Sequence, residues 1–151
     1  YNKEVYENLA NKFKNEGVDI KKIIFLSKTK SDEFMKDYYK IDLALDTFPY
    51  TGVTTTCEAL WMNVPVISMA GFNFNSRCGE SILINSNLKN LVAKNKDSYI
   101  SKVVSFANDL NKLEQTRKFI FDEILKTNTF NTKKFAVNFW KSILDTYTNH
   151  K

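Results

Sequence analysis

Histidine is almost absent from this 151-residue sequence, because its single copy, His150, stands one place before the C-terminal residue. Without an interior histidine, neither a Ser-His-Asp nor a Cys-His catalytic arrangement can be assembled from this chain. The two cysteines, Cys57 and Cys78, have no CxxC spacing and no histidine nearby, so no metal site is expected. We interpret Cys57 as a small buried side chain rather than a nucleophile. The sequence therefore offers no catalytic residue of its own.

Arginine and long apolar runs are also scarce. Of the 22 basic residues only Arg77 and Arg117 are arginines, and the lysines are scattered among Asn, Asp and Glu. The net charge of +5 is therefore interpreted as a solvated surface, and no nucleic-acid partner is expected. The apolar runs are far shorter than the roughly 20 residues of a membrane span, and no secretory leader is visible. These features predict a cytoplasmic protein without a membrane partner.

Apolar segments with helical and strand periods alternate along the rest of the chain. Such alternation predicts one α/β domain over residues 1–151, a Rossmann-like, doubly wound parallel sheet followed by C-terminal helices. Ligands of such sheets bind beyond the carboxyl ends of the strands. The expected strands are Lys22–Ser27, Ile41–Leu45, Pro65–Met69 and Leu91–Ala93; the expected helices are Glu4–Glu16, Ser31–Tyr39, Thr55–Met62, Gly79–Asn85, Asp97–Leu110, Leu113–Leu125 and Thr132–Tyr147.

Residues 41–65 (IDLALDTFPYTGVTTTCEALWMNVP) are the most informative stretch. A short apolar run ends at Asp46, and a turn-rich loop then leads into a helix that opens with threonines. The first amides of a helix lack intrahelical partners and carry positive potential, which suits a phosphate or diphosphate. A purely structural explanation is also open, because Thr55 and Glu58 have the spacing of a capping box.

The same stretch, together with PVISMAG and NSRCGESIL, closely resembles a known enzyme family. It is similar to the C-terminal catalytic lobe of glycosyltransferase family 41, which includes O-linked N-acetylglucosamine transferase and the plant O-fucosyltransferase SPINDLY. The motifs TFPY and TTTCE most resemble those of the SPINDLY-like and bacterial members. The resemblance covers most of the chain and implies one half of a GT-B fold, with the donor site in the cleft between two lobes. The start at Tyr1 rather than Met suggests a piece of a larger protein.

The resemblance implies roles for particular residues. Thr54 and Thr55 match threonines that contact the donor diphosphate, and Glu58 matches an acid that binds the ribose hydroxyls, although the capping box explains Glu58 equally well. Gly52 is expected to let the backbone come close to the ligand or adopt a positive φ, although turn geometry alone would explain it equally well. Phe34, Tyr50 and Arg77 are expected base or pocket contacts, each with a packing or ion-pair alternative, and Thr29 is a further expected contact. Asp46 is expected to hold the loop amides.

The sequence also departs from the N-acetylglucosaminyl members of the family. Val53 replaces a histidine before the threonine pair, and Ser31 and Phe34 stand where those members have a lysine and a histidine. The resemblance therefore implies a nucleotide-sugar donor, UDP- or GDP-linked, without naming the sugar. No cofactor or metal ion is implied.

Two function classes follow. The first is the donor-binding lobe of an inverting glycosyltransferase that acts on Ser or Thr of proteins, inactive as this fragment alone. The resemblance then places the base and a phosphate-binding lysine in an N-terminal lobe, and tetratricopeptide repeats for the protein acceptor further upstream. The second is a non-catalytic nucleotide-binding or protein-interaction module of the same fold. The helix Thr132–Tyr147 carries an apolar stripe that either packs in the core or crosses to the other lobe.

Overall fold

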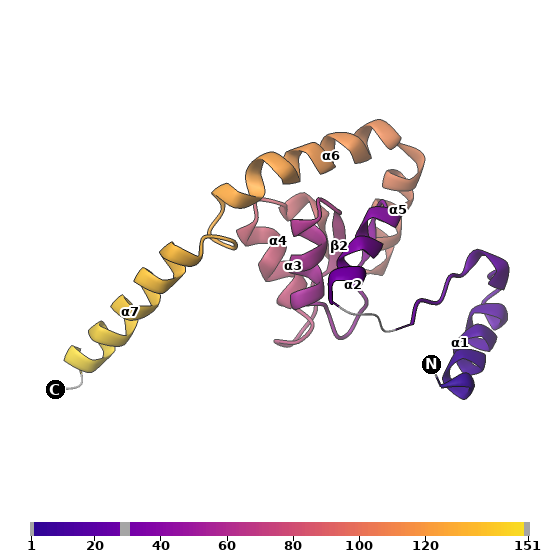
Figure 1. Cartoon of the computed structure of the whole chain (residues 1–151), viewed down its shortest axis with the longest axis horizontal. Helices are drawn as coiled ribbons and strands as arrows, with labels where there is room; N and C mark the ends of the chain where they lie inside the picture. Colours follow the sequence, from indigo (N-terminus) through magenta and orange to yellow (C-terminus); the bar gives the residue numbers. More distant parts are fainter. Residues whose placement is uncertain (1, 28–30, 150–151) are drawn as a thin grey trace. The chain divides into compact units, whose positions relative to one another are not determined.

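The structure is a computed structural model that describes residues 2–27 and 31–149 (Figure 1). The chain divides into two compact units, Tyr1–Asp37 and Tyr38–Lys151. Among the described residues, no helix combines the length and the apolar character that a membrane span requires. The same residues contain no cluster of three or more His, Cys, Asp or Glu arranged to hold a metal ion.

The N-terminal unit contains two α-helices, α1 (Lys3–Asn15) and α2 (Ser31–Asp37), with a 3-10 turn at Ile20–Lys22. Helix α1 begins after Asn2, whose Oδ1 accepts a hydrogen bond from the Glu4 amide, and it ends before Gly17, whose φ is 77°. The ring of Phe25 packs edge-on against the α1 aromatics Tyr6 and Phe13, at 4.7 and 6.5 Å between centroids. This small aromatic cluster is the packing that organises the unit.

The strand expected at Lys22–Ser27 is not formed in the part of this segment that the structure describes. Lys22 closes the 3-10 turn instead, and no residue of the segment pairs with another strand. Ile24 is 83% exposed, as an extended segment without a partner would leave it. A strand needs a neighbour to accept and donate its backbone hydrogen bonds, and an apolar run alone does not supply one.

The C-terminal unit is built on a parallel sheet of three short strands in the order β1-β2-β3. The strands are β1 (Ala44–Leu45), β2 (Val66–Met69) and β3 (Val92–Ala93). Ala44 lies opposite Val66 and Ser68 lies opposite Val92, which fixes the register. Strand β2 is central and almost fully buried, which explains why its sequence is a continuous run of small and apolar residues.

The helices α3 (Thr54–Trp61) and α4 (Cys78–Asn85) connect consecutive strands, and α5 (Lys96–Asn108) follows the third strand. All three pack against the sheet, and α3 also packs against α4 (Figure 1). The remaining elements are 3-10 turns at Tyr38–Lys40, Lys89–Leu91 and Ile124–Lys126, and the helices α6 (Leu110–Glu123) and α7 (Thr132–Asn149). Fully buried core side chains include Leu60, Ile67, Leu83, Leu91 and Ile120. The α/β fold with a parallel sheet and C-terminal helices is as predicted.

Helix α7 has no buried residue. Its apolar stripe is exposed throughout: Phe139 is 52% and Trp140 is 62% accessible to solvent. Of the two alternatives for this helix, packing in the core of the chain is therefore wrong. The stripe stays available for a contact outside the described residues.

Candidate functional site

Asp46 lies at the carboxyl end of β1 and connects three segments of the sheet edge. Its Oδ1 accepts a 2.6 Å hydrogen bond from the Gly52 amide, and its Oδ2 accepts one of 2.6 Å from the Ser68 hydroxyl. Its backbone carbonyl accepts a 3.2 Å hydrogen bond from the Tyr99 hydroxyl of α5. Burial raises the pKa of the Asp46 carboxyl, and the bonds from Ser68 and Gly52 offset part of this rise. The expectation that Asp46 holds a loop amide is confirmed at Gly52.

Helix α3 begins one residue earlier than predicted, with Val53 as its N-cap residue. Valine has no side-chain acceptor, and the cap forms no side-chain hydrogen bond. Thr55 is therefore inside the first turn, and the capping box expected from Thr55 and Glu58 is not formed. The reason is that the helix start follows the loop geometry at Gly52 and Val53, whereas the spacing of Thr55 and Glu58 would serve only a helix that began at Thr55.

Three other helices, α1, α5 and α6, begin with a capping side chain, whereas the side chain of Arg77, the N-cap residue of α4, makes no capping hydrogen bond, as at α3. Asn95 caps α5 in a full capping box with Ser98, and Asp109 caps α6. At α4 the amide of Gly79 donates to the hydroxyl of Thr51, which comes from the loop before α3. The side chains of Thr54 and Thr55 are exposed at the start of α3. The first turn of α3 thus presents backbone amides and two hydroxyls to solvent without an N-cap side chain.

Gly52 packs tightly against this turn. A Cβ at position 52 would lie 2.6 Å from the hydroxyl oxygens of both Thr55 and Thr56. Among the described glycines only Gly17 has a positive φ, so the positive-φ explanation for Gly52 is wrong, and close approach of its backbone to a ligand stays a prediction. Gly52 leaves room for the threonine side chains of the helix start.

Glu58 lies on α3, one turn beyond the threonines. Its Oε2 accepts a 3.4 Å hydrogen bond from the hydroxyl of Tyr38, which also lies 3.3 Å from the Thr55 carbonyl oxygen. Burial, followed by the charge of Glu58, raises the pKa of Tyr38 to about 12, so the phenol stays protonated and can donate. Burial and the same carboxylate raise the pKa of the Cys57 thiol, which favours the unreactive protonated form.

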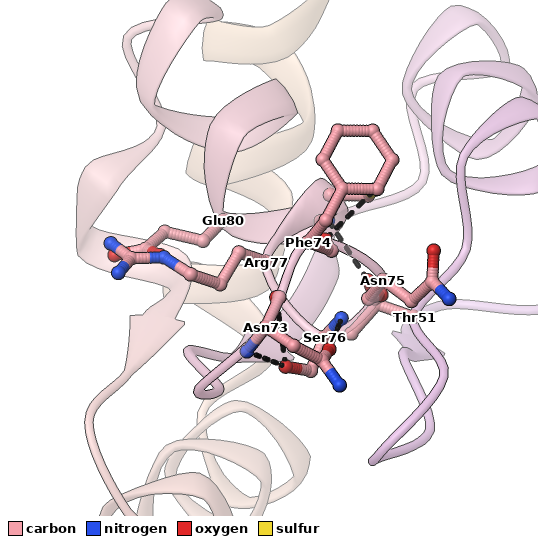
Figure 2. A network of polar contacts seen from close by, with 9 residues as sticks. Thr51, Asn73, Phe74, Asn75, Ser76, Arg77 and Glu80 are labelled. Atoms are coloured by element: carbon pink, nitrogen blue, oxygen red, sulfur yellow. Dashed lines mark hydrogen bonds and ion pairs between the residues drawn. The ribbon is translucent and has the colours of Figure 1, made fainter.

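The loop after β2 is held by its own polar network, shown in Figure 2. The Asn73 amide donates to Ser76 Oγ and the Ser76 amide donates to Asn73 Oδ1, each at 3.0 Å. Thr51 Oγ1 donates to the Asn75 carbonyl at 2.9 Å, which joins this loop to the one before α3. Arg77 Nε contacts Glu80 Oε2 at 2.9 Å, so the ion pair that we considered for Arg77 is present.

Two hollows border the start of α3. An open cleft of about 450 Å³ lies between the α3 and α4 starts and is mostly apolar; it is lined by Val53, Phe74, Arg77, Cys78, Ser81 and Ile82. A smaller hollow of about 120 Å³ is lined by residues from the strand side, among them Tyr38, Asp46, Thr55 and Thr56. Of these two hollows, the cleft beside Val53 has the volume of a small-molecule site, whereas the one on the strand side is much smaller.

The structure brings Gly52, Thr54, Thr55 and Glu58 together on one loop and helix. Tyr50 lies on the same loop and is 72% exposed. Phe34 lies on α2 in the N-terminal unit and is 39% exposed, so its role stays a prediction. Thr29 lies outside the described residues.

Sequence reasoning missed four residues of this edge: Tyr38, Thr51, Ser68 and Tyr99. Only Ser68 carried a signal, because it is a polar residue inside a buried strand. Thr51 and Ser68 are almost fully buried, and every buried side-chain polar atom in the described residues has a hydrogen-bond partner. These residues hydrogen-bond to α3, to Asp46 at the end of β1 and to the loop after β2.

The fold and this edge define a class of protein: an α/β lobe whose loops gather at the carboxyl ends of parallel strands, where the ligands of such sheets bind. A model of the family "Glycosyl transferase family 41" matches residues 2–139, so this chain belongs to that family. The family predicted from the sequence is thereby confirmed.

Individual relatives agree. The chain is 38% identical over 119 residues to a barley protein and 40% identical over 116 residues to an Arabidopsis protein. Both are named probable UDP-N-acetylglucosamine–peptide N-acetylglucosaminyltransferase SPINDLY, and the matches cover 79% and 72% of this chain. A solved structure of a mutant Thermobaculum terrenum O-GlcNAc transferase superposes with a TM-score of 0.86 at 28% identity, over 91% of this chain and 26% of its own. The chain spans about an eighth of the length of the two plant relatives, at 12% and 13%.

Proposed function

We propose that this chain is the donor-binding lobe of an inverting protein O-glycosyltransferase, which transfers a sugar from a UDP- or GDP-linked donor to Ser or Thr. The observation that carries the proposal is the start of α3, where Thr54 and Thr55 are exposed and the N-cap residue Val53 provides no side-chain acceptor. Membership of glycosyl transferase family 41 supports it, because relatives are named as transferases of sugars from a nucleotide to peptides.

In this proposal the donor diphosphate binds at the first turn of α3. The amides of that turn and the hydroxyls of Thr54 and Thr55 donate to the phosphate oxygens, and Gly52 allows the turn to form. As the glycosidic bond breaks, the leaving diphosphate gains negative charge, and the positive end of the helix stabilises it. This arrangement assigns the neutralisation of the diphosphate to the helix, without a metal ion.

The carboxylate of Glu58 is the proposed acceptor for the ribose hydroxyls, since it can accept two O–H bonds from a vicinal diol. Tyr38 already donates to one of its oxygens, so the ribose would use the remaining lone pairs. Tyr50, Arg77 and Phe34 are proposed pocket contacts, and Thr29 is proposed on the resemblance alone. The open cleft beside Val53 and Phe74 is suited to the sugar side of the donor.

The remaining parts of the machinery are assigned to the rest of the protein. The base that activates the acceptor hydroxyl and a phosphate-binding lysine belong to an N-terminal lobe, and upstream repeats hold the protein acceptor in the cytoplasm. Helix α7 extends this proposal, because its exposed aromatic stripe is suited to cross to that lobe. The isolated chain should therefore turn over no donor.

The test is a transfer assay with labelled sugar nucleotides and Ser/Thr peptides. The full-length protein should transfer sugar from a UDP- or GDP-linked donor, and the 151-residue chain should transfer none. Calorimetric titration with UDP and GDP side by side identifies which nucleotide base the donor carries. A full-length protein that binds neither nucleotide would contradict the proposal, and transfer by the isolated chain would contradict the division of labour.

A further inference from the structure

We infer that Asp46 is a positioning residue of the donor site: its carboxylate fixes the loop before α3 to β2 and α4, and this holds the open amides of α3 in place for a diphosphate. The inference rests on the proposed function and adds to it a residue that touches no donor. It stands on the hydrogen bonds and the close packing around this one carboxylate.

The two oxygens of Asp46 serve different elements. Oδ1 holds the Gly52 amide, and Gly52 directly precedes the N-cap residue Val53 of α3. Oδ2 holds the hydroxyl of Ser68, which is fully buried in the central strand. A carboxylate can accept both bonds at once, whereas an alanine would leave both donors without a partner. The Asp46 carboxylate therefore links the residue before the N-cap of α3 to the buried central strand of the sheet.

The same carboxylate is also packed against α4. A Cβ on Gly79 would collide with Asp46 Oδ2 and with Ser68 Oγ, so the α4 start approaches as closely as a glycine allows. The Gly79 amide in turn donates to Thr51 Oγ1 at 3.1 Å, one residue before Gly52. Loop 47–53 is therefore held at two points. The Thr51 hydroxyl accepts from the Gly79 amide of α4, and the Gly52 amide donates to Asp46, which also accepts from Ser68 of β2.

Charge and position predict opposite effects on an anionic ligand. A buried carboxylate near a diphosphate repels it, so if charge were the whole effect, removing Asp46 would tighten binding. If Asp46 acts by position, removing it loosens the amides and weakens binding. Asparagine separates the two, because its Oδ1 can still accept from Gly52 while the charge is lost.

The experiment uses the full-length protein with Asp46→Ala, Asp46→Asn and Ser68→Ala. Ser86→Ala is the matched control, because Ser86 is also a buried serine with a single side-chain hydrogen bond, to Thr129, away from this edge. UDP and GDP are titrated beside uridine and guanosine, and hydrogen exchange is followed in the peptides that cover residues 47–57. The nucleosides lack the diphosphate and report general damage to the site.

Asp46→Ala should weaken binding of the nucleoside diphosphate about tenfold or more and leave the nucleoside within about threefold. Asp46→Asn should stay within about threefold of the parent for both ligands, and Ser68→Ala should fall between. Exchange should rise in residues 47–57 for Asp46→Ala and stay unchanged for Ser86→Ala. Equal losses for diphosphate and nucleoside, unchanged exchange, or an Asn variant as weak as the Ala variant would each overturn the inference while the proposed function stands. If the parent binds neither UDP nor GDP, the proposed function fails and the inference fails with it.

Discussion

Gly79 lies against Asp46 so closely that a methyl group on Gly79 would occupy the space of the Asp46 carboxylate. The glycine is inside helix α4, where its conformation is ordinary and any residue could adopt it. The requirement for glycine therefore comes from tertiary packing between α4, β1 and β2. Through this packing α4, which follows the Asn73–Ser76 loop, contacts the end of β1, where Asp46 accepts from the Gly52 amide.

Gly79→Ala should consequently destabilise the protein, although alanine is the better helix former. Forcing a Cβ into this space moves Asp46 or Ser68, and overpacking of this kind costs about 1–3 kcal/mol. Denaturant unfolding measures the difference. Ser81→Ala, at an exposed position of the same helix, is the control and should be neutral or slightly stabilising. A Gly79→Ala variant as stable as the parent would contradict the close packing.

The threonines at the start of α3 give a second prediction. Thr54→Val and Thr55→Val should each weaken nucleotide binding by about 1–3 kcal/mol, because a charged phosphate loses a hydroxyl donor. Since neither residue is the N-cap, both variants should keep the melting temperature of the parent. Thr116→Val, at a half-buried position of α6, controls for the loss of a helical threonine hydroxyl. If both variants bind the diphosphate as the parent does, the site relies on backbone amides alone.

Tyr38 and Glu58 give a third prediction. Tyr38→Phe removes the phenol that donates to Glu58 Oε2 and should lower stability by about 0.5–1.5 kcal/mol, the usual range for one hydrogen bond. Because the phenol helps to orient the proposed ribose acceptor, nucleotide affinity should also fall a few-fold. Glu58→Gln should reduce affinity more than Tyr38→Phe, since it changes the acceptor itself. Calorimetric titration of both variants orders the two effects, and the reverse order would exclude the role assigned to Glu58.

A fourth prediction concerns pH. The pKa of Asp46 is raised above its ordinary value of 3.8 in the folded chain. At a pH between the unfolded and the folded pKa, the folded state therefore holds more protons than the unfolded state. The contribution of Asp46 to stability is therefore fully present below the ordinary value and is lost as the pH rises through the folded pKa. Tyr99 faces the same group and its raised pKa adds a loss only in alkaline solution.

Unfolding free energies of the parent and of Asp46→Asn, measured from about pH 3.5 to 7, test this sign. As the pH rises, the unfolding free energy of the parent should fall relative to that of Asp46→Asn. A difference that stays constant over this range would show that the carboxyl titrates alike in the folded and unfolded chain.

Local patterns predicted much of this fold from the sequence. The run VISM became the central strand because a buried parallel strand needs small or apolar side chains on both faces. The α3 start was placed within one residue, since the turn-rich loop before it allows no other regular structure. The Lys22–Ser27 strand failed because pairing depends on a partner, which an apolar run does not specify. The capping box failed because spacing alone does not determine which residue the helix begins at.

The candidate site divides in the same way. Gly52, Thr54, Thr55 and Glu58 lie within seven residues of one loop and helix, so a motif could identify them. Of the partners of Asp46, Ser68 and Tyr99 could not be predicted, because they are 22 and 53 residues away along the chain. Those contacts arise only when the strand ends and α5 come together.

The last prediction concerns α7 and separates this chain from the whole protein. Trp140 and Leu144 lie one turn apart on the exposed stripe and are 62% and 58% accessible. In the isolated 151-residue chain, Trp140→Ala and Leu144→Ala should each change the unfolding free energy by no more than about 0.5 kcal/mol, as exposed substitutions do. In the full-length protein, contact with the N-terminal lobe would bury both side chains, and the losses should then rise to about 2–5 kcal/mol. Lys141→Ala, beside Trp140 but outside the stripe, should be near neutral in both proteins. Thermal or denaturant unfolding of the paired variants measures the effect, and equal, small changes in both proteins would show that α7 does not pack against the other lobe.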